Sequence, residues 1–341
     1  MKFNSIDLFS GCGGLTEGLH QAGFETKVAV EIEEDAVLAF KMNHKKTEVI
    51  KKDIREITAE EIKKYLNGEP LHLLAGCPPC QGFSAVRRLN RSESIHDERN
   101  DLILEYLRLV RELKPLTIML ENVPGLANYD KFKMAVEELK SLGYDPKFDI
   151  VNVKDFGVPQ SRKRLVMVGS RIGELEIADS PYEKRTVWDT IGHLESETKT
   201  DDELHKIFPK HTEAVMDKIK NTPKNGGSRK DLPAKYTLPC HKKKNVGFND
   251  IYGRLRWDDY STTITGGCLN PSKGRFLHPE KDRCITAREA ALLQSFPKDY
   301  KFPTTISRTA LALMIGNALP PKFSYYQAAN IYKHLQENLI E

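Results

Sequence analysis

Hydrophobic and polar positions alternate with two different periods in the first half of the chain. Apolar runs of strand length occupy residues 2–9, 28–32, 71–76, 117–123 and 164–171. Segments with the spacing of an amphipathic helix lie between them, at 15–24, 33–44, 102–113 and 134–144. Because strands that alternate with helices form parallel sheets, the pattern predicts an α/β, Rossmann-like fold with a mostly parallel sheet and helices on both faces.

The regular alternation ends near Pro181. Short polar pieces punctuated by Gly and Pro follow at 221–235, 238–248 and 264–276, and helical spacing returns at 286–296 and from residue 307 onward. We therefore expect a larger domain over residues 1–185, completed by 303–341. A smaller irregular domain is expected over residues 186–302.

Positive charge is concentrated in the smaller expected domain. The 341 residues carry a formal net charge of only +4, but residues 205–256 contain 13 Lys and Arg against four Asp and Glu, a local charge of +9. A concentrated basic stretch favours a polyanionic partner such as a nucleic acid.

Membrane insertion and a disulfide scaffold are not expected. The longest apolar runs, such as 71–76 and 310–316, are far shorter than the roughly 18 residues that a spanning helix needs. The first residues lack the pattern of a signal peptide, which predicts a cytoplasmic protein. Six cysteines in so long a chain are too sparse for a disulfide framework, so any special cysteine is expected to be a reactive thiol.

A glycine turn between a strand and a helix is the first motif that indicates chemistry. In DLFSGCGGLTEG (7–18) the turn would let a ligand approach the backbone at a helix start. Glu31, about 20 residues on, could accept hydrogen bonds from a ribose, and Asp53 could hold an adenine amino group. A nicotinamide site remains an alternative, although Thr16 stands where G-x-G-x-x-G has its third glycine. A simple tight turn with solvated acids is the other alternative.

The segment GCPPCQGFS (76–84) gives the sharpest signal. Cys80 follows a Pro-Pro pair at the end of a predicted buried strand, where a parallel sheet places its active-site edge. Cys77 and Cys80 also form a C-x-x-C pair, which could be a redox or zinc site. Zinc needs about four ligands and no second C-x-x-C or H-x-x-x-H occurs, so no metal is expected, while a redox pair stays open.

Two further segments place charged side chains at predicted strand ends. ENVPGL (121–126) puts Glu121 at the end of an apolar strand, where a buried carboxylate would need a partner. In QSRKRL (160–165), strand alternation would put Arg162 and Arg164 on one side, facing an anionic or carbonyl-bearing substrate. Solvated surface positions are the ordinary alternative for all three residues.

Taken in order, these segments resemble those of the cytosine-5 DNA methyltransferases of the prokaryotic restriction-modification type. DLFSGCGGL resembles the cofactor loop, GCPPCQGFS the nucleophile loop, ENVPGL the glutamate motif and QSRKRL the paired-arginine motif. RCITAREAALLQSFP (283–297) resembles the helix that braces the recognition domain, and GNALPP (316–321) resembles the final cofactor motif. The resemblance spans almost the whole chain except for residues 195–250.

The resemblance implies a class I methyltransferase fold with a target-recognition domain. It also implies a particular reaction. A methyl group would pass from S-adenosylmethionine to carbon 5 of a cytosine that has been flipped out of a specific duplex DNA sequence, leaving S-adenosylhomocysteine. Cys80 would be the covalent nucleophile, Glu121 would hold and protonate the ring nitrogen, and Arg162 and Arg164 would orient the base and a phosphate. Residues 84–100 resemble a loop that closes over DNA. The residues implied for the cofactor pocket are Phe9, Gly11, Gly13, Leu15, Glu31, Ile32, Asp53, Ile54, Pro79, Leu102, Asn317 and Ala318.

The expected partner is double-stranded DNA, with a cognate restriction endonuclease suggested by the family's genetic context. We expect a monomer in the cytoplasm, associated with the nucleoid. A methyltransferase of the same fold that acts on tRNA cytosine is the nearest rival, and the long basic domain favours DNA. A nicotinamide-dependent oxidoreductase and an inactive DNA-binding homologue are the more distant alternatives.

Overall fold

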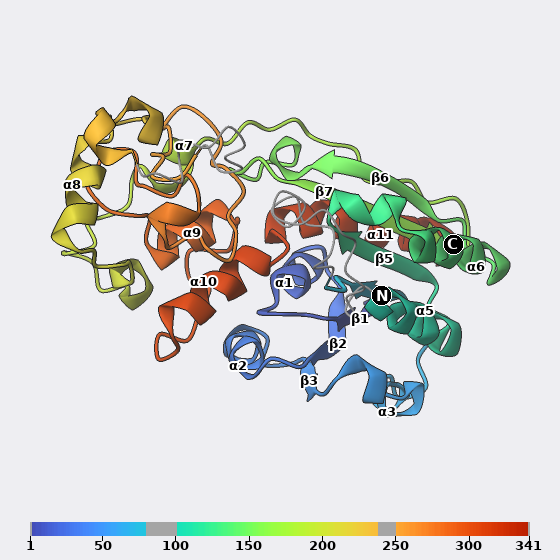
Figure 1. Cartoon of the computed structure of the whole chain (residues 1–341). Helices are drawn as coiled ribbons and strands as arrows, with labels where there is room; N and C mark the ends of the chain where they lie inside the picture. The colour runs from blue at the N-terminus through green and yellow to red at the C-terminus, as the bar shows by residue number, and fades with distance from the viewer. Residues whose placement is uncertain (1, 80–100, 238–249, 340–341) are drawn as a thin grey trace. The chain divides into compact units, whose positions relative to one another are not determined.

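The computed structural model describes residues 2–79, 101–237 and 250–339 and divides into two compact units (Figure 1). The first unit consists of Met1–Phe156, Lys163–Pro181 and Leu319–Glu341. The second consists of Gly157–Arg162 and Tyr182–Ala318.

These boundaries differ from the expected ones at residues 185 and 303. Residues 303–318 belong to the second unit, because the helix that ends at Asn317 packs there. A Cβ added at Gly316 would lie 2.1 Å from the carbonyl carbon of Thr265, so the two backbones are in direct contact. Sequence periodicity detects such a helix but not the unit to which it belongs. The functional roles of the two units stay predictions.

The first unit contains a seven-stranded sheet with the order β3-β2-β1-β4-β5-β7-β6. Its strands are β1 (Asn4–Leu8), β2 (Glu25–Glu31), β3 (Glu48–Lys51), β4 (Leu73–Gly76), β5 (Thr117–Asn122), β6 (Lys147–Asn152) and β7 (Lys163–Ser170). Strands β1 to β5 are parallel where they pair, and β7 is antiparallel to both β5 and β6. The mostly parallel sheet is therefore confirmed. Strand β6 was not predicted, because side chains on it such as Phe148 and Ile150 are exposed and blur its alternation.

Helices cover both faces of this sheet, as predicted (Figure 1). They are α1 (Gly14–Gln21), α2 (Glu34–Asn43), α3 (Ala59–Lys63), α5 (Leu102–Leu113), α6 (Asp130–Ser141) and α11 (Pro321–Leu339). On one face, Val28 and Val30 join the core cluster with Tyr106 of α5 and Phe132 of α6. On the other, Ala29 packs against α2. No helix in the described part of the chain is long and apolar enough to cross a membrane.

The second unit is irregular and carries short helices. They are α7 (Val187–Ile191), α8 (Glu213–Asn221), α9 (Ala287–Leu293) and α10 (Arg308–Asn317). Its described residues form only isolated backbone bridges, such as Arg254↔Leu277, instead of strand ladders. The fully buried guanidinium of Arg254 donates to the carbonyls of Thr222, Ile219, His278 and Lys281 and to the carboxylate of Asp282. One buried cation thus satisfies backbone acceptors that a sheet would otherwise pair.

Helices α1 and α11 approach each other closely at Gly18. A Cβ added to Gly18 would lie 2.3 Å from Ser324 Cβ and 2.7 Å from the Pro321 carbonyl oxygen. Only a residue without a side chain fits there, so the α1 glycine fixes how α11 closes this face of the sheet.

We predict that Gly18→Ala lowers the free energy of unfolding by about 1–3 kcal/mol, because the new methyl group must push α11 away. Urea denaturation measures the change. Gln21→Ala, at an exposed position on the same helix, is the control and should stay within about 0.5 kcal/mol of wild type. Equal or higher stability of Gly18→Ala would contradict the close approach, since alanine favours helices in the absence of a clash.

Candidate active site

The order of the strands turns between β1 and β4, and two of the predicted motifs meet there. In open parallel sheets the point where the strand order reverses is the usual ligand site. Leu8 is the register partner of Gly76, and the Cys77 backbone N–H donates to the Leu8 carbonyl at 3.2 Å. The glycine loop after β1 and the Cys-Pro-Pro segment after β4 therefore leave the sheet side by side.

The glycine loop needs a left-handed backbone. Gly11 and Gly13 have φ angles of +55° and +93°, a region that favours glycine. Gly13 is the N-cap of α1, and its N–H donates to the Ser10 carbonyl at 2.9 Å. A Cβ placed on Gly11 would meet no described residue within 4 Å, so the described part of the chain leaves space beside this backbone.

Glu31, at the end of β2, holds this loop in place. Its carboxylate accepts the N–H of Gly11 at 2.7 Å and the N–H groups of Ile32 and Glu33, each at 2.9 Å. Burial raises the pKa of Glu31, while the three N–H donors oppose that rise. Glu31, which the sequence predicts to bind a ribose, thus also accepts a hydrogen bond from the glycine loop.

Glu121 and Arg164 form a buried pair at the ends of β5 and β7. Glu121 pairs in register with Val166, so Arg164, two residues away, lies on the same face of the sheet. Arg164 Nε donates to Glu121 Oε1 at 2.7 Å. Burial lowers the pKa of Arg164, and the negative charge of Glu121 opposes this effect. The buried carboxylate therefore has the partner that the sequence required.

Cys77 lies next to this pair, and Asn122 secures the segment that follows it. Burial and then the charge of Glu121 raise the pKa of the Cys77 thiol, which favours the unreactive protonated form. The Asn122 side chain donates to the Pro78 carbonyl at 2.8 Å, which ties the end of β5 to the Pro-Pro pair. Cys80 and the segment 84–100 lie outside the described residues.

The family is decided by comparison with known proteins. A family model described as C-5 cytosine-specific DNA methylase matches residues 3–333. The chain belongs to this family. It is therefore a DNA (cytosine-5)-methyltransferase, and the nicotinamide interpretation of the glycine turn is wrong.

Two relatives and one solved structure agree with the assignment to the methylase family, and a second solved structure shares the fold. The Type II methylase M.HgiDII of Herpetosiphon aurantiacus is 33% identical over 97% of this chain and 95% of its own length. The Type II methyltransferase M1.HphI of Haemophilus parahaemolyticus is 32% identical over 98% of this chain and 87% of its own length. A structure of a DNA modification methyltransferase encoded within an E. coli prophage has a TM-score of 0.74 at 26% identity, covering 98% and 100% of the two chains. A mutant of Spodoptera frugiperda DNMT2 shares the fold at 19% identity, with a TM-score of 0.59 over 100% of both chains.

Arg162 of the methylase is placed differently from the expectation. Strand β7 begins at Lys163, so strand alternation does not relate Arg162 to Arg164 and the argument for a shared face is wrong. Arg162 is buried in the second unit, where its Nη1 donates to the carbonyls of Ile264 at 3.0 Å and Gly316 at 2.9 Å. Its orienting role stays a prediction.

Most residues expected in the cofactor pocket lie in the first unit. Phe9 and Leu102 pack against its core, while Leu15 and Ile54 are buried. Ile32 is 54% exposed directly after Glu31, which leaves an apolar surface open beside the glycine loop. Pro79 is also exposed. Asn317 and Ala318 belong to the second unit.

Asp53 has a local partner. It caps the short helix Ile54–Glu56 and accepts from the Arg55 side chain through both carboxylate oxygens, at 3.0 and 2.6 Å. The Arg55 side chain holds the pKa of Asp53 below its usual value. An adenine amino group is therefore a second potential donor to this carboxylate, and its contact stays a prediction.

Two side chains that support the glycine loop were missed in the sequence. Desolvation lowers the pKa of His44 to about 3, and its ring is hydrogen-bonded to the backbone of Gly13. Asp7, fully buried on β1, accepts the Thr16 hydroxyl at 2.6 Å through Oδ2. A charged residue inside an apolar strand was the available signal for Asp7, whereas no pattern marked His44. The described residues contain no group of three or more His, Cys, Asp or Glu that could hold a metal.

Asp7 combines complete burial with an incomplete set of partners. Its Oδ1 has no hydrogen-bond partner among the described residues. Burial raises the pKa of Asp7 to about 7, Thr16 lowers it, and the charge of Glu31 raises it further. Between pH 4 and pH 7 the folded protein thus keeps a proton that the unfolded chain has released.

We predict that wild-type stability falls relative to Asp7→Asn as the pH rises from about 4 to about 7. Because the pKa of Asp7 is higher in the folded state, its protonation stabilises the folded protein. This stabilisation is fully present below the unfolded-state pKa near 3.8 and is lost as the pH rises through about 7. The difference should be at most about 4 kcal/mol. Urea denaturation at pH 4.5, 6 and 8 measures it. Asp179→Asn, at an exposed position in the same unit, is the control. A difference that stays constant over this range would contradict the burial of an ionisable Asp7.

Proposed function

We propose that the protein transfers a methyl group from S-adenosylmethionine to carbon 5 of cytosine within a specific duplex DNA sequence, through a covalent adduct of Cys80. The family assignment supplies the reaction class. The observation that supports the mechanism is the arrangement at one edge of the sheet. The glycine loop, the segment that leads into Cys80 and the Glu121–Arg164 pair follow strands that neighbour one another.

The residues of the first unit fit an adenosyl ligand with a charged amino-acid tail. The described residues leave space beside the Gly11 backbone, and the uncovered Ile32 offers an apolar surface for a flat base. Glu31 and Asp53 supply carboxylates for ribose and amino-group donors, because each carboxylate oxygen can accept more than one hydrogen bond. When bound, S-adenosylmethionine supplies an electrophilic methyl group.

Cys80 is the nucleophile in this mechanism. Carbon 5 of cytosine is poorly nucleophilic, and addition of a thiolate to carbon 6 turns the ring into an enamine-like species that attacks the methyl group. Loss of the carbon 5 proton and of the thiolate then restores the aromatic ring and the free enzyme. Pro79 directly precedes Cys80, and Asn122 fixes the neighbouring Pro78 at the sheet edge.

Glu121 holds the ring nitrogen and the amino group of the cytosine. Negative charge grows on the ring during thiolate addition, and a proton taken up from solvent and held between Glu121 and the ring nitrogen would relieve it. Arg164 fixes Glu121 through Oε1, which limits the rotation of the carboxyl group. We assign Arg164 to orientation of this acid and of the base.

The target must leave the DNA stack, because carbon 6 is inaccessible inside a duplex, and enzymes that modify a base flip it out of the helix into their active site. The second unit would bind the flanking DNA and read its sequence with a few side chains. We take the segment 84–100 as the part that covers the flipped base. A tRNA substrate is the competing proposal.

The central prediction is methyl transfer to duplex DNA but not to tRNA. The protein is incubated with radiolabelled S-adenosylmethionine and either genomic DNA or total tRNA, and Cys80→Ala is tested in parallel. Wild type should label DNA, and Cys80→Ala should lose at least about 10³-fold in rate while it keeps cofactor affinity. Transfer of the radiolabel to tRNA but not to DNA would contradict the proposal that DNA is the substrate.

Trapping on 5-fluorocytosine tests the same adduct directly. The fluorine blocks loss of the carbon 5 substituent, so a duplex bearing this base in the target site should stay bound through denaturing electrophoresis. Cys77→Ala is the matched control and should still be trapped, because the Cys77 thiol is kept protonated beside Glu121. Loss of trapping in Cys77→Ala would show that Cys77 forms the adduct, which would contradict the role of Cys80 and support a role for the C-x-x-C pair.

We also predict that Glu31→Ala weakens S-adenosylmethionine binding by about 10- to 100-fold. The substitution removes the acceptor of three backbone N–H groups, including that of Gly11, so the loop loses its fixed conformation. Calorimetry measures the dissociation constant. Glu33→Ala removes a neighbouring exposed acid and should leave it within about twofold. An unchanged constant for Glu31→Ala would remove this residue from the pocket.

A further inference from the structure

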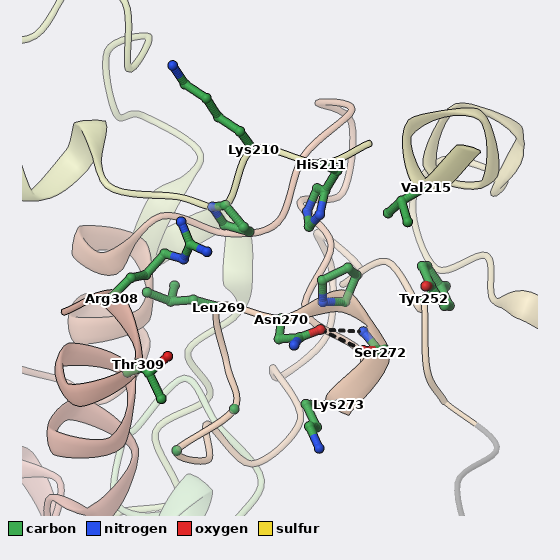
Figure 2. A pocket seen from close by; sticks show the side chains of 15 residues that line it. Lys210, His211, Val215, Tyr252, Leu269, Asn270, Ser272, Lys273, Arg308 and Thr309 are labelled. Carbon is green, nitrogen blue, oxygen red and sulfur yellow. Dashed lines mark hydrogen bonds between the residues drawn. The ribbon is translucent and has the colours of Figure 1, made fainter. Parts of the chain in front are cut away.

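A pocket of about 320 Å³ lies within the second unit (Figure 2). Its lining includes four basic side chains, Lys210, His211, Lys273 and Arg308. Figure 2 shows that they come from separate segments: 210–211 precede α8, Lys273 follows the 266–271 loop, and Arg308 begins α10. Segments far apart in the sequence therefore bring positive charge to one place.

No described acidic side chain neutralises the positive charge of this pocket. No Asp or Glu occurs among the described residues that line it. Lys210, Lys273 and Arg308 form no ion pair with any part of the chain that the structure describes. In the same unit Arg254, Arg275, Arg283 and Arg288 are each ion-paired, at N–O distances of 2.6 to 3.0 Å. A cluster of unpaired cations beside fully paired arginines points to an anion from outside the chain.

His211 also senses the charge of Arg308. Desolvation and then the positive charge of Arg308 lower the pKa of His211, so its ring is neutral near pH 7. His211 Nε2 lies 3.9 Å from Cys284 Sγ, which holds the ring at the wall of the pocket. A neutral imidazole carries one N–H, so an anion bound beside Arg308 could accept a hydrogen bond from His211.

Side chains pack closely against two of the glycines that line the pocket. A Cβ at Gly266 would lie 2.6 Å from Leu313 Cδ1, and one at Gly267 would lie 2.8 Å from Lys273 Cβ. Asn270 accepts the Ser272 N–H at 3.0 Å and its hydroxyl at 2.7 Å, which shapes the turn before Lys273. The cations thus project from a fixed surface, which lowers the entropy cost of binding.

The start of α10 adds to the positive field. Arg308 and Thr309 line the pocket and occupy the first turn of this 10-residue helix. The Ser307 side chain accepts the Ala310 N–H at 3.1 Å, while the first backbone N–H groups of a helix have no partner within the helix. The helix dipole favours negative charge at this end.

We propose that this pocket binds a phosphate of the DNA backbone and thereby sets the register of the second unit on the duplex. The inference rests on the proposed function, because it takes duplex DNA as the ligand. It adds a non-catalytic contact that carries affinity without reading a base. Phosphate contacts of this kind position a protein on DNA but do not specify sequence.

The test is the salt dependence of DNA binding, measured by fluorescence anisotropy with a short duplex of arbitrary sequence over a range of NaCl concentrations. We expect Lys210→Gln/Lys273→Gln/Arg308→Gln to lower the slope of log K against log[NaCl] by about 1, because the loss of one phosphate contact removes roughly 0.9. Affinity should fall by about 10-fold or more, and equally for duplexes of different sequence.

Two variants make the result specific. Lys133→Gln/Lys140→Gln/Lys333→Gln removes the same charge from exposed positions of the first unit and should leave the slope unchanged to within about 0.3. Lys210→Arg/Lys273→Arg/Arg308→Lys keeps the charge and should retain most of the wild-type slope. Thermal unfolding checks that each variant is folded.

An unchanged slope and affinity in the folded triple Gln variant would overturn the inference, while methylation of duplex by wild type would still support the proposed function. If the wild-type protein neither bound nor methylated duplex DNA, both this inference and the proposed function would be wrong. Calorimetry with inorganic phosphate separates the sources of the anion. Tight binding of free phosphate, together with wild-type DNA affinity in the triple Gln variant, would assign the pocket to a free anion and overturn the DNA contact.

Discussion

Three carboxyl groups, two of them buried and that of Glu31 partly buried, lie near strand ends of the first unit, and each must find a donor. Glu31 takes backbone N–H groups of the glycine loop, Asp7 takes Thr16 on α1, and Glu121 takes Arg164 on β7. Leaving any of them without a donor would cost several kcal/mol, on the order of the net stability of a domain. The requirement to satisfy these acids therefore fixes the loop, the first turn of α1 and the β5–β7 edge together.

Local sequence predicted much of this arrangement. The parallel half of the sheet follows from apolar runs that are buried on both faces, and the glycine loop follows from residues that tolerate positive φ. Strand β6 was not predicted, because its exposed apolar residues Phe148 and Ile150 obscure the alternation of buried apolar and exposed polar positions. The division between units, the anchoring of Arg162 on two carbonyls and the contact of His44 with Gly13 depend on residues distant in sequence. No periodicity encodes them.

The second unit reaches order by a different physical route. Without strand ladders in its described residues, buried arginines take the backbone acceptors, as Arg254 does for four carbonyls. Such a network depends on particular side chains more than on backbone pairing. Basic residues in this unit therefore have two roles: those paired with acids support the fold, and those in the pocket at α10 remain available to an anion.

The chain passes from one unit to the other at residues 156, 162, 181 and 318, so neither unit is a continuous stretch. Helix α11, which packs against α1 at Gly18, is made from the final residues of this sequence. During synthesis on the ribosome, all residues between α1 and α11 must be made before α11 can cover that face of the sheet. A nascent chain would expose apolar surface throughout this interval, which makes it a natural client for chaperones that hold unfinished proteins.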